Sequence, residues 1–255
     1  MARTAIPGRL TWRPATVVET TFETPQVKNI ALTVPGWTGH RAGQHVDVRL
    51  TAPDGYQAER CYSIASSPED GYVVLSVERL DDGVVSPFLV HELRVDDEIE
   101  LRGPVGGYFV WDEPLGGPLF LVADGSGLAP LRAMMRHHRA TRSEVPVRAL
   151  CSADSLEALL YRDELMELAA CDPFDISITL TREQPSAWRG YHRRIDSDLL
   201  AEVAWPPEDR SLAYICGPTA FVETAAAGLV ALGHDPARIR TERFGGPRQV
   251  LLRET

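Results

Sequence analysis

Hydrophobic and polar positions alternate with a period of two through much of the first hundred residues. Six such runs, separated by turns that contain Gly or Pro, predict short strands at residues 15–21, 27–34, 45–50, 59–64, 72–78 and 98–102. Strands of this length and rhythm are typical of a small antiparallel barrel. One helix is predicted between the last two strands, at residues 86–93, because Ser86 suits the N-cap and Pro87 the first helical position.

In the second half of the chain, short apolar runs alternate with longer amphipathic segments. Strands are predicted at residues 119–123, 147–151, 176–180, 213–216 and 239–244, and helices at 130–139, 156–170, 196–203 and 219–232. This alternation predicts a parallel sheet with helices on both faces. We therefore expect an antiparallel β-barrel at residues 11–113, followed by a doubly wound parallel-sheet α/β domain at residues 117–245.

Composition and charge exclude several classes of protein. The 255 residues, 44% of them hydrophobic, are enough for two cores. A net charge of −10 argues against nonspecific binding of nucleic acid. No apolar run approaches the ~18–20 residues that cross a bilayer, and the first ten residues lack an apolar core of signal-peptide length. We expect a cytoplasmic protein with no membrane span.

The four cysteines do not have the spacing of a metal site. Cys61, Cys151, Cys171 and Cys216 lie too far apart in sequence for the short motifs of zinc or iron–sulfur centres. No metal and no disulfide framework are expected. If the protein moves electrons, an iron–sulfur relay would belong to another chain.

Two short segments carry groups that suit a flavin nucleotide. In Arg60-Cys61-Tyr62-Ser63, the side chains of Arg60 and Tyr62 point to the same face of the predicted strand. A Tyr ring can cover the flat isoalloxazine, and a guanidinium can pair with a phosphate. Gly83-Val84-Val85-Ser86 opens the predicted helix, whose free N–H groups favour a pyrophosphate. The first segment alone is more typical of an ordinary strand; the two together favour a flavin.

From about Thr11 to Phe244 the sequence resembles the ferredoxin–NADP reductase superfamily. The blocks that carry the resemblance are, in order, Ala42-Gly43-Gln44, Arg60-Cys61-Tyr62-Ser63, Gly83-Val84-Val85-Ser86, Gly103-Pro104-Val105-Gly106-Gly107-Tyr108-Phe109, Gly125-Ser126-Gly127-Leu128-Ala129-Pro130, Cys216-Gly217-Pro218 and Glu242-Arg243-Phe244. The resemblance implies FAD more often than FMN. It implies that Arg60 contacts the flavin phosphate, Tyr62 packs on the isoalloxazine and Ser63 lies near its N5, with Val85 and Ser86 at the pyrophosphate.

Gly125-Ser126-Gly127 follows a predicted strand and opens a helix, which is the setting of a phosphate-binding turn. Pro130 stands where a Rossmann fingerprint has its third Gly, and the resemblance implies that this form binds the nicotinamide nucleotide. Asp124 departs from the family, which usually has Gly or Thr there. A carboxylate ~4 Å from a phosphate costs roughly 1 kcal/mol in water and ~4 at an effective dielectric of 20. Asp124 weakens nucleotide binding unless it turns outward or caps the following helix.

The choice between NADH and NADPH depends on the residues after the second strand of this half. Asp154 can accept a hydrogen bond from a ribose diol and would repel a 2′-phosphate, which favours NADH. Arg162 and Arg182 stand against that choice, since either could meet a phosphate; for Arg162 an ordinary surface position is the simpler interpretation.

The resemblance also implies the residues around the point of hydride transfer. It places Cys216 beside the meeting point of nicotinamide and flavin, and Glu242 close to the flavin. Ser63, Cys216 and Glu242 are therefore the candidate catalytic residues. Residues 245–255 contain no aromatic side chain, so no terminal aromatic lid is expected. The full set expected to bind cofactor is Arg60, Cys61, Tyr62, Ser63, Gly83, Val84, Val85, Ser86, Phe109, Gly125, Ser126, Gly127, Pro130, Asp154, Arg182, Cys216, Gly217, Pro218 and Phe244.

The expected function is that of an NAD(P)H-dependent flavoprotein reductase. Hydride would pass from the nicotinamide to FAD, and electrons would pass on to a redox partner, a ferredoxin or an oxygenase-type acceptor. A second hypothesis is a flavin-binding module or a non-reductase flavoenzyme, with a nicotinamide site impaired by Asp124 and Asp154. A plain two-domain scaffold without cofactor is a third.

Overall fold

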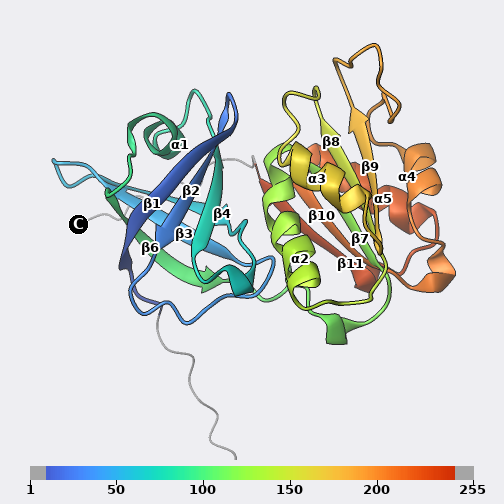
Figure 1. The fold of residues 1–255 in the computed structure, drawn as a ribbon, viewed down its shortest axis with the longest axis horizontal. Coiled ribbons are helices and arrows are strands. Elements are labelled where there is room, and N and C mark those ends of the chain that lie inside the picture. Colours follow the sequence, from blue (N-terminus) through green and yellow to red (C-terminus); the bar gives the residue numbers. More distant parts are fainter. Residues whose placement is uncertain (1–9, 245–255) are drawn as a thin grey trace, which may run out of the picture.

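The computed structural model describes residues 10–244, which form two lobes side by side (Figure 1). The first lobe contains six strands in the antiparallel order β4-β3-β6-β1-β2-β5. Their bounds are β1 Arg13–Thr24, β2 Val27–Thr33, β3 His45–Thr51, β4 Gln57–Ser63, β5 Val73–Glu78 and β6 Glu98–Val105. All six predicted strands are present, each within a few residues of its expected ends.

The two edge strands of this sheet meet, so the sheet curls into a barrel. An antiparallel bridge joins Ile64, just after β4, to Leu75 of β5. Inward-facing side chains alternate along the strands as the period of two requires, and Val46, Val48 and Ile30 are fully buried among them. The antiparallel barrel predicted from the sequence is confirmed.

The second lobe is a five-stranded parallel sheet with the order β11-β10-β7-β8-β9. Its elements are β7 Leu119–Asp124, α2 Leu128–Ala140, β8 Val147–Ala153, α3 Arg162–Ala169, β9 Phe174–Leu180, α4 Ser197–Val203, β10 Leu212–Pro218, α5 Thr219–Ala231 and β11 Ile239–Phe244. Helices α2 and α3 cover one face and α4 and α5 the other (Figure 1). The doubly wound domain is confirmed, and the two domain boundaries predicted from the sequence stay predictions.

The helix predicted at residues 86–93 is present at residues 85–92, but its turns and its N-cap differ from the prediction. The structure has one short turn, α1 Val85–Pro87, followed by a π-helical turn at Phe88–Glu92. Ser86 is not the N-cap, because it lies inside α1, where its hydroxyl accepts a hydrogen bond from the Leu80 amide at 3.1 Å. The hydroxyl therefore closes the preceding loop instead of capping a helix.

The helix predicted at residues 156–170 begins six residues late, at Arg162. Tyr161 has a left-handed backbone with φ 54°, which a continuous right-handed helix excludes. Its amide donates to the Glu23 carboxylate of β1 at 2.7 Å. A contact with the other domain thus fixes the start of α3, and no local sequence signal reports it.

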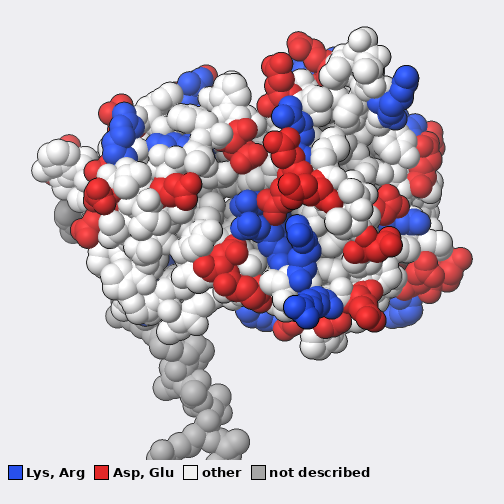
Figure 2. Space-filling view, in the orientation of Figure 1, with Lys and Arg blue, Asp and Glu red and all other residues white. Residues whose placement is uncertain are grey.

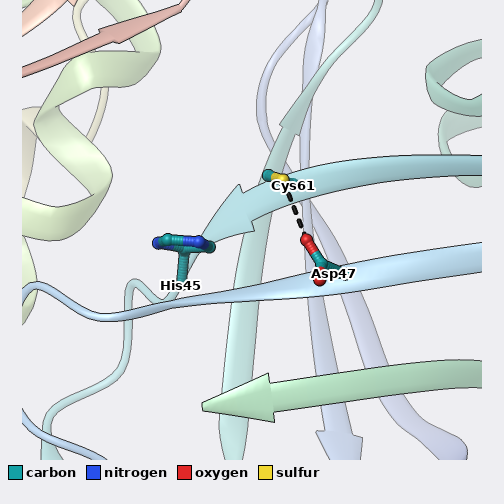
Figure 3. Close-up of side chains that lie close together, drawn as sticks. All are labelled: His45, Asp47 and Cys61. Atoms are coloured by element: carbon teal, nitrogen blue, oxygen red, sulfur yellow. Dashed lines mark hydrogen bonds between the residues drawn. The ribbon is translucent and has the colours of Figure 1, made fainter. Parts of the chain in front are cut away.

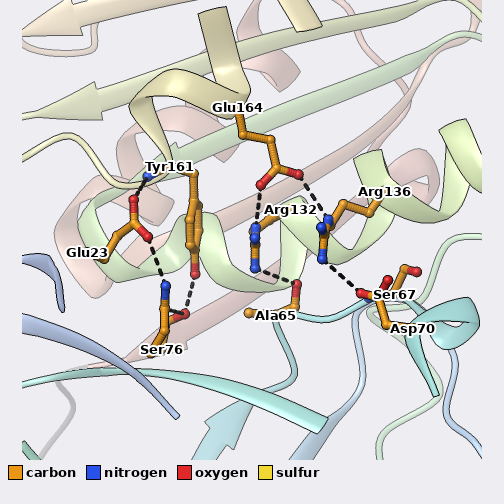
Figure 4. A network of polar contacts seen from close by, with 10 residues as sticks. Glu23, Ala65, Ser67, Asp70, Ser76, Arg132, Arg136, Tyr161 and Glu164 are labelled. Carbon is orange, nitrogen blue, oxygen red and sulfur yellow. Dashed lines mark hydrogen bonds and ion pairs between the residues drawn. The ribbon is translucent and has the colours of Figure 1, made fainter. Parts of the chain in front are cut away.

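A network of polar contacts joins the domains beside α2 (Figure 4). The Glu164 carboxylate pairs with Arg132 at 2.7 Å and with Arg136 at 3.1 Å, and Arg136 reaches Asp70 of the barrel at 2.9 Å. Basic side chains gather at this junction between flanking acidic ones (Figure 2). Tyr161 also hydrogen-bonds Ser76 of the barrel. We call Asp70, Arg132, Arg136 and Glu164 the interdomain brace.

Among residues 10–244, no helix combines the length and apolar character that a membrane span requires.

Candidate functional site

Three side chains from both domains come together at the end of the barrel strand β4. Ser63 ends β4, Glu242 lies in β11, and Cys216 of β10 is its partner in the parallel register. The Ser63 hydroxyl lies close enough to the Glu242 carboxylate to oppose a rise in its pKa. The three candidate catalytic residues thus share one site at the domain boundary, although Ser63 and Glu242 are 179 positions apart in the sequence.

Burial governs the protonation of the Glu242 carboxyl and the Cys216 thiol. It raises the pKa of the Glu242 carboxyl to about 7, against the opposing effect of the nearby Ser63 hydroxyl. The other oxygen, Oε2, is buried and has no hydrogen-bond partner among the described residues. Burial and the nearby Glu242 charge also raise the pKa of the Cys216 thiol, so this thiol is neutral at physiological pH. The site holds a carboxyl that titrates near neutrality beside a small, uncharged neighbour.

The expected flavin contacts Arg60 and Tyr62 occupy the same face of β4. They lie opposite Val48 and Val46 of β3, and the Tyr62 ring packs against the barrel core. Arg60 donates to the neighbouring Glu59 carbonyl at 2.7 Å and forms no ion pair within residues 10–244. An aromatic ring and a guanidinium without a carboxylate partner fit a flat ring with a phosphate tail. The residues present therefore fit a flavin nucleotide.

Cys61 points to the opposite face of β4, beside His45 and Asp47 of β3 (Figure 3). The ligand atoms of these three residues lie within 4.8 Å of one another. The Cys61 thiol donates to Asp47 at 2.9 Å, and burial together with this bond raises its pKa to about 12. Arg102 already pairs with the Asp47 carboxylate at 2.8 Å. A guanidinium this close repels a metal cation, so we assign no metal here.

The second expected flavin segment forms the loop into α1. The Gly83 amide donates to the Leu80 carbonyl at 2.8 Å, which turns the chain sharply before the helix. Val85 and Ser86 are buried, whereas Val84 is 54% exposed. The segment offers its backbone and the Val84 side chain to a ligand. The Ser86 hydroxyl already accepts a hydrogen bond from the Leu80 amide. Its contact with a pyrophosphate stays a prediction.

The turn formed by Gly125, Ser126 and Gly127 leads from β7 into α2, and Pro130 is buried in the first turn of that helix. Gly125 has φ 54°, and a Cβ on Gly127 would stand 2.3 Å from the Cys216 carbonyl oxygen. Both glycines are therefore needed for this backbone. We call residues 125–127 the nucleotide turn. It lies directly against the strand that carries Cys216.

Asp124 neither turns outward nor caps the helix. It is half-buried at the end of β7 opposite Ser152, whose hydroxyl lies close enough to act on its pKa. No side-chain capping bond reaches the turn that follows. Burial raises the pKa of the Asp124 carboxyl, and the nearby charges of Asp154 and Glu78 raise it further. The expectations that the Asp124 carboxylate turns outward or caps the following helix are therefore both wrong.

Asp154 and Arg182, which favour different donors in the sequence analysis, form an ion pair. Their side chains are 3.2 Å apart, and both are more than half exposed. The Thr181 hydroxyl donates to the same carboxylate at 2.9 Å. Each group thus partly neutralises the other at the edge of the sheet.

The remaining expected cofactor residues are distributed unevenly. Gly217 is buried against Asp124 and Phe221, and Pro218 is exposed at the end of β10. Phe244 is half-buried against the core of the second domain. The Phe109 ring is only 7% exposed and packs edge-on against Tyr214, so it contributes to the core, and its contact with cofactor stays a prediction. Residues 245–255, where no aromatic lid is expected, lie outside the described residues.

Sequence reasoning missed Glu78. This last residue of β5 accepts a hydrogen bond from the Ser126 hydroxyl, with 2.7 Å between the two oxygens. The only local sign was an acidic residue at the end of a strand, which is common on protein surfaces. The structure instead brings it from the barrel onto the nucleotide turn.

Comparison with known proteins finds one family for each of the two lobes. Residues 14–110 match the family described as oxidoreductase FAD-binding domain, and residues 121–227 match the oxidoreductase NAD-binding domain. The ferredoxin–NADP reductase B of Sorangium cellulosum is 34% identical over 212 residues, which are 80% of this chain and 84% of that protein.

A glycine betaine monooxygenase reductase subunit of Pseudomonas aeruginosa is 31% identical over 208 residues, 80% of this chain. The match spans only 56% of that relative, so the chain corresponds to little more than half of its length. The solved flavohem-like FAD/NAD binding domain of a Vibrio cholerae nitric oxide dioxygenase has a TM-score of 0.82 at 26% identity and covers 92% of this chain and 99% of that one. The chain belongs to the ferredoxin–NADP reductase superfamily and carries its FAD-binding and NAD-binding domains in that order.

Proposed function

We propose that the protein is an NAD(P)H-dependent flavoprotein reductase that passes electrons to a ferredoxin or an oxygenase-type acceptor. The observation that carries this proposal is the meeting of Ser63, Cys216 and Glu242 at the domain boundary, between the flavin segment and the nucleotide turn. Two cofactors held by separate domains can react only where those domains meet. A site built from both domains supports that arrangement.

FAD, when bound, supplies a ring that accepts a hydride from the nicotinamide and can release electrons singly. The chain's own residues bind and orient. Tyr62 offers an apolar ring to stack on, and Arg60 offers an unpaired guanidinium to a phosphate. The Glu242 carboxyl lies beside the Ser63 hydroxyl and can hold a proton near neutral pH. The neutral Cys216 thiol adds no charge that would oppose a cationic nicotinamide product or a hydride donor.

The test is anaerobic mixing of the FAD-loaded protein with NADH and with NADPH, followed by the visible flavin absorption. Rapid bleaching by either donor supports the proposal. A band that persists with both donors at saturating concentration contradicts it.

A second candidate function is a flavin-binding module that does not use a nicotinamide donor. The observation that favours it is the pair of carboxylates, Asp124 and Glu78, beside the nucleotide turn. Replacing Asp124 with Gly restores bleaching in a defective protein if charge is the obstacle. The first candidate is preferred because the rest of the site is present in both domains.

We propose NADH as the preferred donor, because an exposed carboxylate at Asp154, after the second strand of the nucleotide domain, would repel an added 2′-phosphate at that edge of the sheet. The partner is proposed from the relatives, one of which is named as a monooxygenase reductase subunit. An iron–sulfur centre in the electron path would lie outside these two domains, since the four cysteines provide no iron–sulfur spacing. The sequence-based expectation of a cytoplasmic protein belongs to the same proposal.

A further inference from the structure

The nucleotide turn is already in contact with an anion from the barrel. Glu78 ends β5, and its Oε2 accepts a hydrogen bond from the Ser126 hydroxyl at 2.7 Å. The end of β5 packs against this turn, so the contact is part of the domain interface. A hydroxyl that donates to a carboxylate oxygen makes the same kind of bond that it would make to a phosphate oxygen.

The Glu78 charge is not used in an ion pair. Within residues 10–244 no Lys or Arg pairs with it, and the adjacent Arg79 pairs with Asp81 at 3.0 Å. Its charge instead acts on Asp124, whose pKa it helps to raise, together with Asp154. The charge of Arg194 opposes that rise. The turn therefore faces negative potential from both domains.

The interdomain brace holds the domains together without Glu78. Arg136 joins Asp70 of the barrel to Glu164, and Arg132 donates to the Ala65 carbonyl at 3.5 Å. Tyr161 adds its contacts with Glu23 and Ser76. The Glu78 carboxylate adds little to the stability of the interface beyond these bonds. Stabilising the interface therefore does not explain why Glu78 lies on the nucleotide turn.

We propose that Glu78 is an internal anion that occupies the nucleotide turn and sets the affinity for the dinucleotide donor. The donor pyrophosphate takes the Ser126 hydroxyl from Glu78 when it binds, and the remaining repulsion from Glu78 weakens the complex. Glu78 thus determines how tightly the donor binds, and it leaves the hydride-transfer step unchanged. This inference rests on the proposed function only in taking residues 125–127 as the donor's phosphate site.

The test replaces Glu78 with Gln, which keeps the shape and an acceptor oxygen and removes the charge. Calorimetric titration of the oxidised, FAD-loaded protein with NAD⁺ measures donor-type binding without any reaction. Removing one negative charge that lies ~4 Å from a phosphate, with the repulsion screened as in water, strengthens binding by at least ~5-fold. We expect E78Q to bind NAD⁺ at least about fivefold more tightly than the wild type, and the difference to narrow as salt is added.

Two further variants separate charge from other causes. Glu19→Gln makes the same change in net charge at an exposed position of β1 and leaves NAD⁺ affinity unchanged. Ser126→Ala removes the hydroxyl and leaves the Glu78 carboxylate, so it does not tighten binding. If Ser126→Ala tightened binding as much as E78Q does, the hydrogen bond and not the charge would govern affinity, and the inference would be overturned.

The failure of the inference is distinct from the failure of the proposed function. E78Q that binds NAD⁺ no more tightly than the wild type overturns the inference, even where NADH bleaches both proteins. Tighter NAD⁺ binding by E78Q without bleaching by NADH or NADPH supports the inference and contradicts the reductase. Absence of NAD⁺ binding in the wild type and all three variants overturns the inference outright.

Discussion

The Ser63 hydroxyl lies beside the Glu242 carboxyl, where the end of barrel strand β4 meets the last strand of the second domain. This proximity brings the flavin segment next to the strand that is paired with Cys216. The carboxyl is not fully satisfied, because Oε2 is buried without a partner among the described residues. The carboxyl is thus held at the domain boundary in a state that favours its protonated form.

The first prediction is that Glu242 makes the protein without cofactor less stable as pH rises from about 4.5 to about 7. Because burial raises the pKa of Glu242 from 4.5 to about 7, the folded state binds more protons than the unfolded state between these values. The contribution of Glu242 is fully lost above the folded pKa, about 3 kcal/mol in the free energy of unfolding. Urea unfolding of Glu242→Gln and wild type at pH 5, 6, 7 and 8 measures it. Parallel pH curves for the two proteins would contradict this account.

The second prediction concerns the Tyr62 ring. Tyr62→Ala removes the aromatic surface on which a flavin would stack and weakens FAD binding by at least about tenfold. Tyr62→Phe keeps the ring and stays within about threefold of wild type. Quenching of FAD fluorescence during titration of the apoprotein gives both affinities, and circular dichroism checks that each variant folds, since Tyr62 also packs on the barrel core. An alanine variant that folds and binds FAD as tightly as wild type refutes the assignment.

The third prediction is that the interdomain brace stabilises the arrangement of the domains. Glu164→Gln leaves Arg132 and Arg136 without their shared carboxylate, and these groups are largely shielded from solvent. We expect a loss of about 1–3 kcal/mol in the free energy of unfolding, between the values of exposed and buried pairs. Asp163→Asn is the matched control: it lies on the same helix and its side chain is 86% exposed, so it costs less than about 0.5 kcal/mol. Equal effects of the two changes would exclude the brace.

The fourth prediction concerns the choice of donor. Asp154→Asn removes the charge that opposes a 2′-phosphate and frees Arg182 from its ion pair. We expect kcat/KM for NADPH to rise about tenfold relative to that for NADH, a difference of about 1.4 kcal/mol. Arg182→Gln in the same background removes most of that gain. An unchanged ratio of the two donors in Asp154→Asn shows that this edge of the sheet does not select the donor.

The periodicity of the sequence was enough to predict the two folds, because alternation of side chains along strands and around helices is a local property. It failed where a hydrogen bond outside the helix decides local structure. Tyr161 delays the start of a helix because its amide bonds Glu23 of the other domain, and Ser86 leaves the cap position because its hydroxyl bonds the Leu80 amide in the preceding loop. The first bond depends on how the domains pack and the second on the shape of the loop, and no helix signal contains either.

The same distinction applies to the candidate site. Ser63, Cys216 and Glu242 were found through a resemblance that covers the whole chain, and the structure brings them together. Glu78 and the group of His45, Asp47 and Cys61 depend on pairing between strands or between domains. Residues joined only by such pairing have no fixed spacing in sequence, so spacing arguments miss them.

The most direct test of the account is the visible spectrum of the FAD-loaded protein, recorded without oxygen before and after addition of NADH. We predict that the main flavin band bleaches within the mixing time at saturating NADH, and more slowly or only at higher concentration with NADPH. A flavin band that stays unchanged with both donors, in a protein that holds FAD, would contradict the proposed reductase.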